Sequence, residues 1–189
     1  MSDSVDWPAV RQAARRTIEA WHRDLAEDRH DCARLRRAQT IDDVFEIDAY
    51  HRLRFRLAET ASQPWIRGER HAEVVARIAL ALAEIKSDQT PETEPAPDTG
   101  SFLALGAALG RLSPERLRLL ANTGEIDLFL RLLRGALAQV ERIAPLWDTA
   151  ETVRRWHFAE QRQLARRDLL IRYHDRKNQS DAKSNEPVE

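Results

Sequence analysis

The chain has 189 residues, of which 42% are hydrophobic and 32% are charged, and its formal net charge is −1. The single cysteine, Cys32, excludes an internal disulfide, and the longest apolar run, Val74 to Ile85, is too short to span a bilayer. The acidic start, Met1 to Asp6, lacks the apolar core of a signal peptide, so we expect a soluble cytoplasmic protein. Glycine and β-branched residues are few, while Ala, Leu, Arg and Glu dominate, which favours helices.

The first half of the chain is predicted to hold helices separated by short polar breaks. Asp6 is a suitable N-cap for a first helix that runs to about Ala26. An arginine-rich helix from about Asp31 to Gln39 follows, and Thr40 to Asp43 is typical of a capped turn. Asp48 caps the next helix. The residues expected on the buried stripe of the first helix are Val10, Ala14, Thr17, Ile18, Trp21 and Leu25.

A second apolar helix is expected from about Glu69 to Ile85, and after it the composition changes completely. The following segment holds Pro91, Pro95 and Pro97 among acidic residues, which is typical of a flexible or extended linker. The sequence therefore predicts an all-α fold of two small helical bundles joined by an acidic, Pro-rich linker. Its expected parts are an N-terminal bundle at 1–86, the linker at 87–100, a C-terminal bundle at 101–177 and a disordered tail at 178–189.

The second half repeats the helical pattern. Ser113 should cap a helix with Pro114 at its first position, and residues 125–140 form a strongly amphipathic stretch. One last helix is expected from about Thr149 to Tyr173. Its predicted buried stripe is Val153, Trp156, Leu164 and Ile171.

No catalytic, metal or cofactor site is expected. A glycine-rich phosphate loop, a paired-cysteine motif and a nucleophile elbow are all missing from the sequence. His22, His30 and Cys32 could in principle bind zinc, but their spacing matches no common site. Two His-Asp pairs, at residues 30–31 and 174–175, invite comparison with helical metal phosphohydrolases, although surface polar residues explain them better.

Arginine is the residue type that points to a function. All but three of the 30 basic side chains are arginine, and lysine occurs only at residues 86, 177 and 183. Groups of arginine on helix faces favour contacts with a polyanion, since guanidinium groups bind phosphate in a bidentate manner. The alternative is a solvated face with local Glu or Asp partners. The candidate nucleic-acid contacts are Arg34, Arg36, Arg37, Arg52, Arg56, Arg111, Arg116, Arg131, Arg134, Arg154 and Arg155.

Trp156 lies next to the last of these groups. It could stack a nucleobase, but a place in the core, in line with Val153 and Leu164, is the favoured interpretation.

Both halves of the chain carry short motifs in a fixed order. The first half carries Ala20-Trp21, Cys32-Ala-Arg-Leu-Arg-Arg37, Thr40-Ile-Asp-Asp-Val44 and Ala49-Tyr-His-Arg-Leu53. The second half carries Leu105-Gly106, Arg111 to Leu120, Arg131-Leu-Leu and Val153-Arg-Arg-Trp156. In their order and spacing these motifs resemble the CasB family, the small subunit of the type I-E CRISPR Cascade complex. The resemblance covers nearly the whole chain.

The resemblance implies an all-helical, non-catalytic subunit that joins Cascade as a head-to-tail pair. It implies contacts with the backbone and large subunits, with the guide RNA–DNA heteroduplex and with the displaced single-stranded DNA, and hence stabilisation of the R-loop. By motif match, Arg36, Arg37 and Arg52 form a first basic group, and Arg111, Arg116 and Arg131 a second.

The chain departs from the family pattern at Ala107, where an arginine is common, and at Leu117, which separates Arg116 from Arg118. These departures leave the path of DNA over the second half open. The rival interpretation is a helical adaptor that binds acidic proteins and has no nucleic-acid role.

Overall fold

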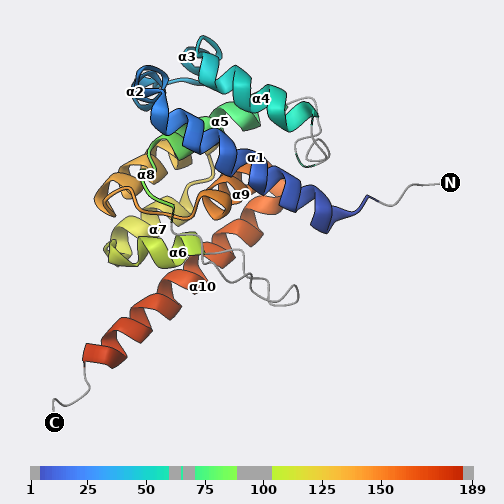
Figure 1. Cartoon of the computed structure of the whole chain (residues 1–189). Helices are drawn as coiled ribbons and strands as arrows, with labels where there is room; N and C mark the ends of the chain where they lie inside the picture. Colours follow the sequence, from blue (N-terminus) through green and yellow to red (C-terminus); the bar gives the residue numbers. More distant parts are fainter. Residues whose placement is uncertain (1–4, 60–64, 66–70, 89–103, 185–189) are drawn as a thin grey trace. The chain divides into compact units, whose positions relative to one another are not determined.

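The computed structural model describes residues 5–59, 65, 71–88 and 104–184, and every regular element in these ranges is a helix (Figure 1). The expected all-α class is thereby confirmed. Within the same ranges the one β pairing is an isolated parallel bridge between Ser87 and Ile143. The chain divides into two compact units, residues 1–84 (unit 1) and residues 85–189 (unit 2). Most of the expected linker, residues 89–100, falls outside the described ranges.

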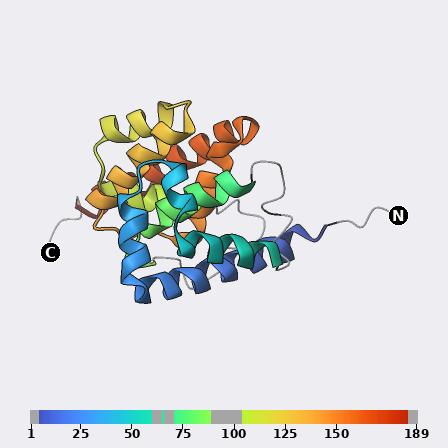
Figure 2. The ribbon, with the colours of Figure 1, turned by 90° about the horizontal axis from the view of Figure 1, so that it is seen from above.

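Unit 1 is organised around its last helix. Every residue of that helix from Val74 to Ala83 is buried, and the four helices before it all contact it. Figures 1 and 2 show α1 and α4 running side by side, an arrangement that their mutual contacts support. The described helices of unit 1 are α1 (Trp7–Glu27), α2 (Arg29–Arg37), α3 (Ile41–Phe45), α4 (Asp48–Glu59) and α5 (His71–Ala83).

The first helix forms as its sequence predicts. The Asp6 carboxylate accepts the backbone N–H of Ala9 at 3.2 Å, and Pro8 lies in the first turn, where its missing N–H costs nothing. All six residues of the expected stripe are buried. The indole Nε1 of Trp21 donates to the carbonyl of Ala49 at 2.7 Å and so ties α1 to the start of α4.

The arginine-rich helix begins two residues before the expected start, at Arg29, because Asp28 and not Asp31 is its N-cap. The Asp28 carboxylate accepts the N–H of Asp31 at 3.0 Å. The Asp31 side chain is buried and instead accepts the N–H of Ala49 at 2.8 Å, in the first turn of α4. A single carboxylate therefore joins α2 to the N-terminal end of α4, where negative charge is favoured.

The capped turn expected at Thr40 is confirmed as the start of α3. The Thr40 hydroxyl accepts the N–H of Asp43, and the Asp43 carboxylate accepts the N–H of Thr40 at 2.9 Å, which makes a full capping box. The same carboxylate accepts the N–H of Gln39. These backbone donors hold the pKa of Asp43 below its ordinary value.

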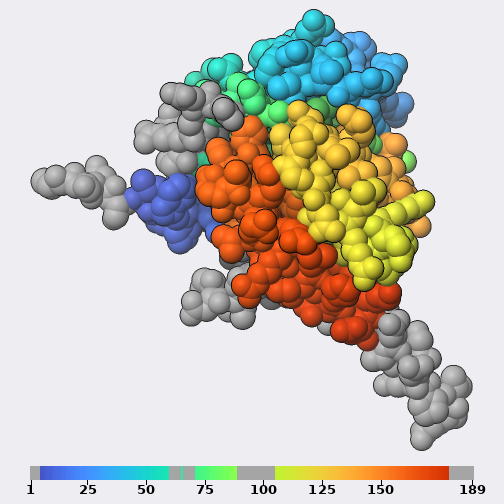
Figure 3. Space-filling model, turned by 180° about the vertical axis from the view of Figure 1, so that it is seen from behind, coloured from blue at the N-terminus to red at the C-terminus, as the bar shows by residue number. Residues whose placement is uncertain are grey.

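Unit 2 is built around the long helix α10. The Tyr173 hydroxyl on α10 donates to the carbonyl of Leu112 at 2.8 Å, and Gly106 lets α6 approach closely, since a Cβ there would lie 2.5 Å from the carbonyl oxygen of Leu169. Figure 3 shows α7 and α8 beside α10 on one face of this unit. Its described helices are α6 (Ala104–Ala108), the 3₁₀ turn η2 (Leu109–Arg111), α7 (Pro114–Asn122), α8 (Ile126–Gln139), α9 (Leu146–His157) and α10 (Ala159–Ser184).

The prediction of a single helix from Thr149 to Tyr173 is wrong. The chain forms two helices, α9 and α10, which are separated by Phe158 in an extended conformation. The helical register restarts at this break, so Leu164 and Ile171 are 56% and 45% exposed instead of buried. The buried residues of α10 are Ala165, Leu169 and Tyr173. The helix also runs on to Ser184, into the segment where the sequence predicts a disordered tail from residue 178.

Candidate nucleic-acid interface

The three candidate arginines of α2, which are Arg34, Arg36 and Arg37, have three different surroundings. Arg34 donates from Nη2 to the carbonyl of Glu46 at 3.0 Å, and its other Nη lies 4.0 Å from the Asp31 carboxylate. Arg36 donates from Nε to the carbonyl of Ala83 at 2.6 Å, where its charge meets the carbonyl end of α5. Arg37 is exposed and has no hydrogen bond or ion pair with the described residues. Of these three candidates, Arg37 is therefore the one with all its donors available to a ligand.

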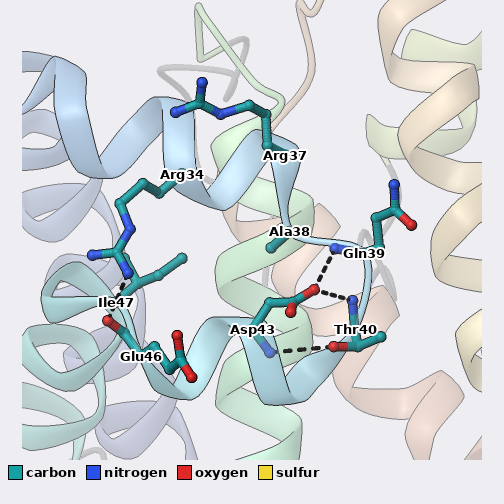
Figure 4. Close-up of a pocket in the computed structure, with 8 residues that line it drawn as sticks. All are labelled: Arg34, Arg37, Ala38, Gln39, Thr40, Asp43, Glu46 and Ile47. Atoms are coloured by element: carbon teal, nitrogen blue, oxygen red, sulfur yellow. Dashed lines mark hydrogen bonds between the residues drawn. The ribbon is translucent and has the colours of Figure 1, made fainter.

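Arg34 and Arg37 border a shallow depression of about 580 Å³ between the end of α2 and α3 (Figure 4). Asp43 and Glu46 also line it, so its charge is mixed. The carboxylate of Asp43 is occupied by the capping box, and Figure 4 shows the Arg37 side chain extending away from both acids. A phosphate group would meet Arg37 at the rim, away from these carboxylates. The remaining lining residues are Ala38, Gln39, Thr40 and Ile47.

Arg52 and Arg56 on α4 are held by carboxylates of other helices. Arg52 makes an ion pair with Asp28 at 2.8 Å and approaches Asp31 at 3.4 Å. Arg56 makes an ion pair with Asp24 of α1 at 2.6 Å. The hydrogen bond from Asp31 N–H and then the Arg52 guanidinium hold the pKa of Asp28 below its ordinary value. Both arginines join helices of unit 1, and both side chains keep an exposed part.

The candidate arginines of η2, α7 and α8 in unit 2 lie mainly at the surface. Arg111 pairs with Glu141 at 3.3 Å, but both side chains are more than two-thirds exposed, so this ion pair contributes little to stability. Arg116 donates to Gln139. Arg131 is exposed and has no hydrogen bond or ion pair with the described residues, whereas Arg134 is half-buried and has an interaction partner.

Arg154 and Arg155 on α9 hold a buried acid. Glu151 lies within 2.9 Å of Arg154 and 3.0 Å of Arg155, and its side chain is only 4% exposed. Arg155 also reaches Asp168 of α10 at 3.1 Å. The two arginines are 15% and 18% exposed, so their geometry serves the packing of unit 2.

Trp156 occupies the core, in agreement with the favoured interpretation of its sequence pattern. It is fully buried, and its ring stacks on that of Phe129 with centroids 3.9 Å apart. No face of this indole is available to a nucleobase.

Several exposed arginines lie outside the candidates predicted from the sequence, and Arg54 is the one next to the candidates of α4. Arg54 on α4 is exposed and forms no hydrogen bond or ion pair with the described residues. Sequence reasoning misses it because it points away from the faces of Arg52 and Arg56. Because it points in a different direction, Arg54 does not meet the acids that bind Arg52 and Arg56. Its position on the helical wheel is therefore the sequence feature that could identify it.

The geometry supports neither the zinc site considered for His22, His30 and Cys32 nor a phosphohydrolase site at the His-Asp pairs. Within the described ranges no three His, Cys, Asp or Glu side chains gather in an arrangement that could hold a metal ion. Asp31, the acid of the first His-Asp pair, is occupied by Ala49 and Arg52. Of the described helices, none is long and apolar enough to cross a membrane.

Comparison with known proteins identifies the family. The model of the family "CRISPR-associated protein Cse2" matches residues 31–174. A chain in the crystal structure of E. coli Cascade bound to a PAM-containing dsDNA target has the same fold, with a TM-score of 0.53 and 21% identity, over 92% of this chain and 99% of that one. The comparison with curated proteins gave no match. The protein therefore belongs to the Cse2 family of CRISPR-associated proteins, the CasB small-subunit family that its sequence motifs resemble.

Proposed function

We propose that the protein is a non-catalytic, nucleic-acid-binding subunit of a Cascade complex in the cytoplasm. Its partners are the backbone and large subunits, a second copy in a head-to-tail pair, the guide RNA–DNA heteroduplex and the displaced DNA strand. The observation that carries the proposal is the family match across both units, residues 31–174. The fold shared with a chain of a DNA-bound Cascade structure supports it.

The environments of the arginines rank the proposed DNA contacts. Arg37, Arg54 and Arg131 are exposed and have every donor available. Arg34, Arg111, Arg116 and Arg134 are partly engaged and take a secondary place. Arg36, Arg52 and Arg56 join helices, but a guanidinium has five donors and those not already used can still bind a phosphate. Arg154 and Arg155 rank last, because both are mostly buried and bound to Glu151.

Such contacts suit R-loop stabilisation. Forming the guide–target heteroduplex replaces one duplex by another of similar stability, so a few contacts to the sugar-phosphate backbone can tip the balance. Arginines on a helical surface hold phosphates without reading bases, and the resulting affinity depends strongly on salt.

The test is assembly and R-loop stability with matched arginine variants. The wild-type chain should co-purify with Cascade subunits and guide RNA. The double variant Arg37→Ala/Arg131→Ala should assemble equally well but form an R-loop that dissociates faster, with a weaker dependence on salt. Failure of the wild-type chain to assemble would refute the Cascade role, while normal R-loops with the double variant would refute this choice of contacts.

The adaptor alternative draws on the exposed apolar face of α10, where Leu164 and Ile171 face solvent. A protein partner could cover this face. A Cascade subunit would also need a surface of this kind for its neighbours in the complex. The adaptor hypothesis differs only in predicting no salt-dependent binding of nucleic acid, so the same experiment separates the two.

A further inference from the structure

A second surface feature of unit 1 lies on α4, away from the candidate arginines of α2. Phe55 is 61% exposed, more than any other large hydrophobic side chain among the described residues. It lines a groove of about 500 Å³ whose surface is mainly apolar. The other lining residues are His51, Arg52, Arg54, Ala58 and His71.

The walls of this groove are held in place by the fold. The Nε2 atom of His51 lies 2.8 Å from the carbonyl oxygen of Phe45, and its ring meets the Tyr50 ring edge-on with centroids 4.9 Å apart. Tyr50 is anchored by its hydroxyl to the carbonyl of Ala72, and Arg52 by its ion pair with Asp28. The His51 ring and the Arg52 guanidinium are therefore held in place, and these walls of the groove need little ordering when a ligand binds.

The charge of the groove has one sign. None of its lining residues carries a carboxylate, and Arg54 has no hydrogen bond or ion pair with the described residues. The depression at Arg34 and Arg37, by contrast, contains two acids. A groove that offers an exposed aromatic ring beside an available guanidinium complements a flat apolar group that bears a negative charge. A nucleotide of a single strand has this chemistry, whereas the bases of a duplex are already stacked on one another.

We propose that Phe55 stacks a base of single-stranded nucleic acid while Arg54 binds a neighbouring phosphate. This inference rests on the proposed function and refines it, because it assigns the groove on α4 to the unpaired strand. Stacking on an aromatic side chain tolerates any base, so the site would hold the strand without choosing its sequence.

The experiment compares two oligonucleotides with the full-length protein. Oligothymidine offers bases and phosphates, while an abasic oligomer of equal length offers phosphates alone. Phe55→Ala should weaken oligothymidine binding about tenfold and leave binding of the abasic oligomer unchanged, and Phe55→Trp should preserve both affinities. Arg54→Ala should weaken both. Leu164→Ala, which removes a side chain of similar exposure from α10, is the matched control and should change neither.

Each outcome separates the two proposals. If the wild-type chain binds neither oligomer, the nucleic-acid-binding part of the proposed function fails. If it binds both equally and Phe55→Ala changes nothing, the stacking site is refuted while phosphate binding stands. If Phe55→Ala leaves both affinities intact but prevents incorporation into Cascade, the groove is a protein-docking surface and the inference is overturned. Circular dichroism should show the same helix content in all variants, since Phe55 contributes little to the core.

Discussion

Two arginine doublets in this protein look alike in sequence and differ in surroundings. At the end of α2, Arg36 binds the last carbonyl of α5 while Arg37 extends into solvent. On α9, Arg154 and Arg155 both contact the buried carboxylate of Glu151. The α2 doublet therefore has one guanidinium fully available to a ligand, whereas the α9 doublet has both committed to the interior of its own unit.

The difference shows that arginine density alone is a poor guide to nucleic-acid contacts. A buried carboxylate and its guanidinium partners must be satisfied together, because removing either leaves an uncompensated charge in a poorly solvated place. An exposed arginine without such a partner is solvated in the folded protein, so it does not lower the stability of the fold. The availability of donors is what separates an interface arginine from a structural one.

The largest effect is expected from removing the charge that holds the α9 doublet. Glu151→Gln should lower the free energy of unfolding by about 2 kcal/mol, because two poorly solvated guanidinium groups lose the charge they share, although Arg155 keeps Asp168 and the amide keeps one acceptor. Urea denaturation measures this loss. The control Glu141→Gln, at an exposed ion pair, should change stability by less than about 1 kcal/mol. If the two variants lost equal stability, the buried ion pairs of Glu151 would be no more important to the fold than the exposed pair of Glu141.

The second prediction concerns binding. Arg37→Ala should leave stability unchanged and lower the slope of log affinity against log salt by about 0.7 for single-stranded DNA, as expected for one lost phosphate contact. Arg154→Ala should do the opposite: the fold is weakened, but the affinity of the folded protein stays the same. Filter binding at several salt concentrations, with melting curves for each variant, distinguishes them. A loss of affinity confined to Arg154→Ala would reverse the assignment.

Much of the fold could be predicted because its signals are local. The cap at Asp6, the stripe of α1 and the box at Thr40 each depend on residues within one or two turns. The break at Phe158 could not be predicted, since neither glycine nor proline marks it and the helical pattern continues on both sides. Tertiary packing decides that break, and the error in register then misplaces Leu164 and Ile171.

For the candidate arginines, too, partners close in the sequence could be predicted and distant partners could not. The carboxylate of Glu151, three and four residues before Arg154 and Arg155, is recognisable from the sequence as a helical ion-pair partner. The acids that hold Arg52 and Arg56 are not, because they come from α1 and from the turn before α2. Sequence spacing identifies partners on the same helix, and only the fold reveals partners on another.

A smaller effect is expected within the α2 doublet itself. Arg36→Ala should cost about 1 kcal/mol of stability, because the carbonyl of Ala83 loses a charged donor at the end of α5. Arg36→Lys should recover part of this loss, since lysine keeps the charge but lacks the planar guanidinium. Thermal melts of both variants beside Arg37→Ala test the division of roles. A larger loss from Arg37→Ala would show that the solvent-facing member is the structural one.

The smallest expected effect is a change in stability at low pH, and it arises at Asp28, the N-cap of α2. The N–H of Asp31 and the Arg52 guanidinium hold the pKa of Asp28 below 3.8 in the folded protein, so the unfolded chain binds a proton at higher pH. The stability that this carboxylate contributes is therefore present at neutral pH and is lost as the pH falls through and below 3.8. Asp28→Asn keeps a capping side chain but loses the charge. The wild type should exceed this variant in stability at neutral pH, and the gap should close in acid, as urea titrations at several pH values would reveal. A gap that stays constant with pH would mean that Asp28 supports α2 through its shape and not through its charge.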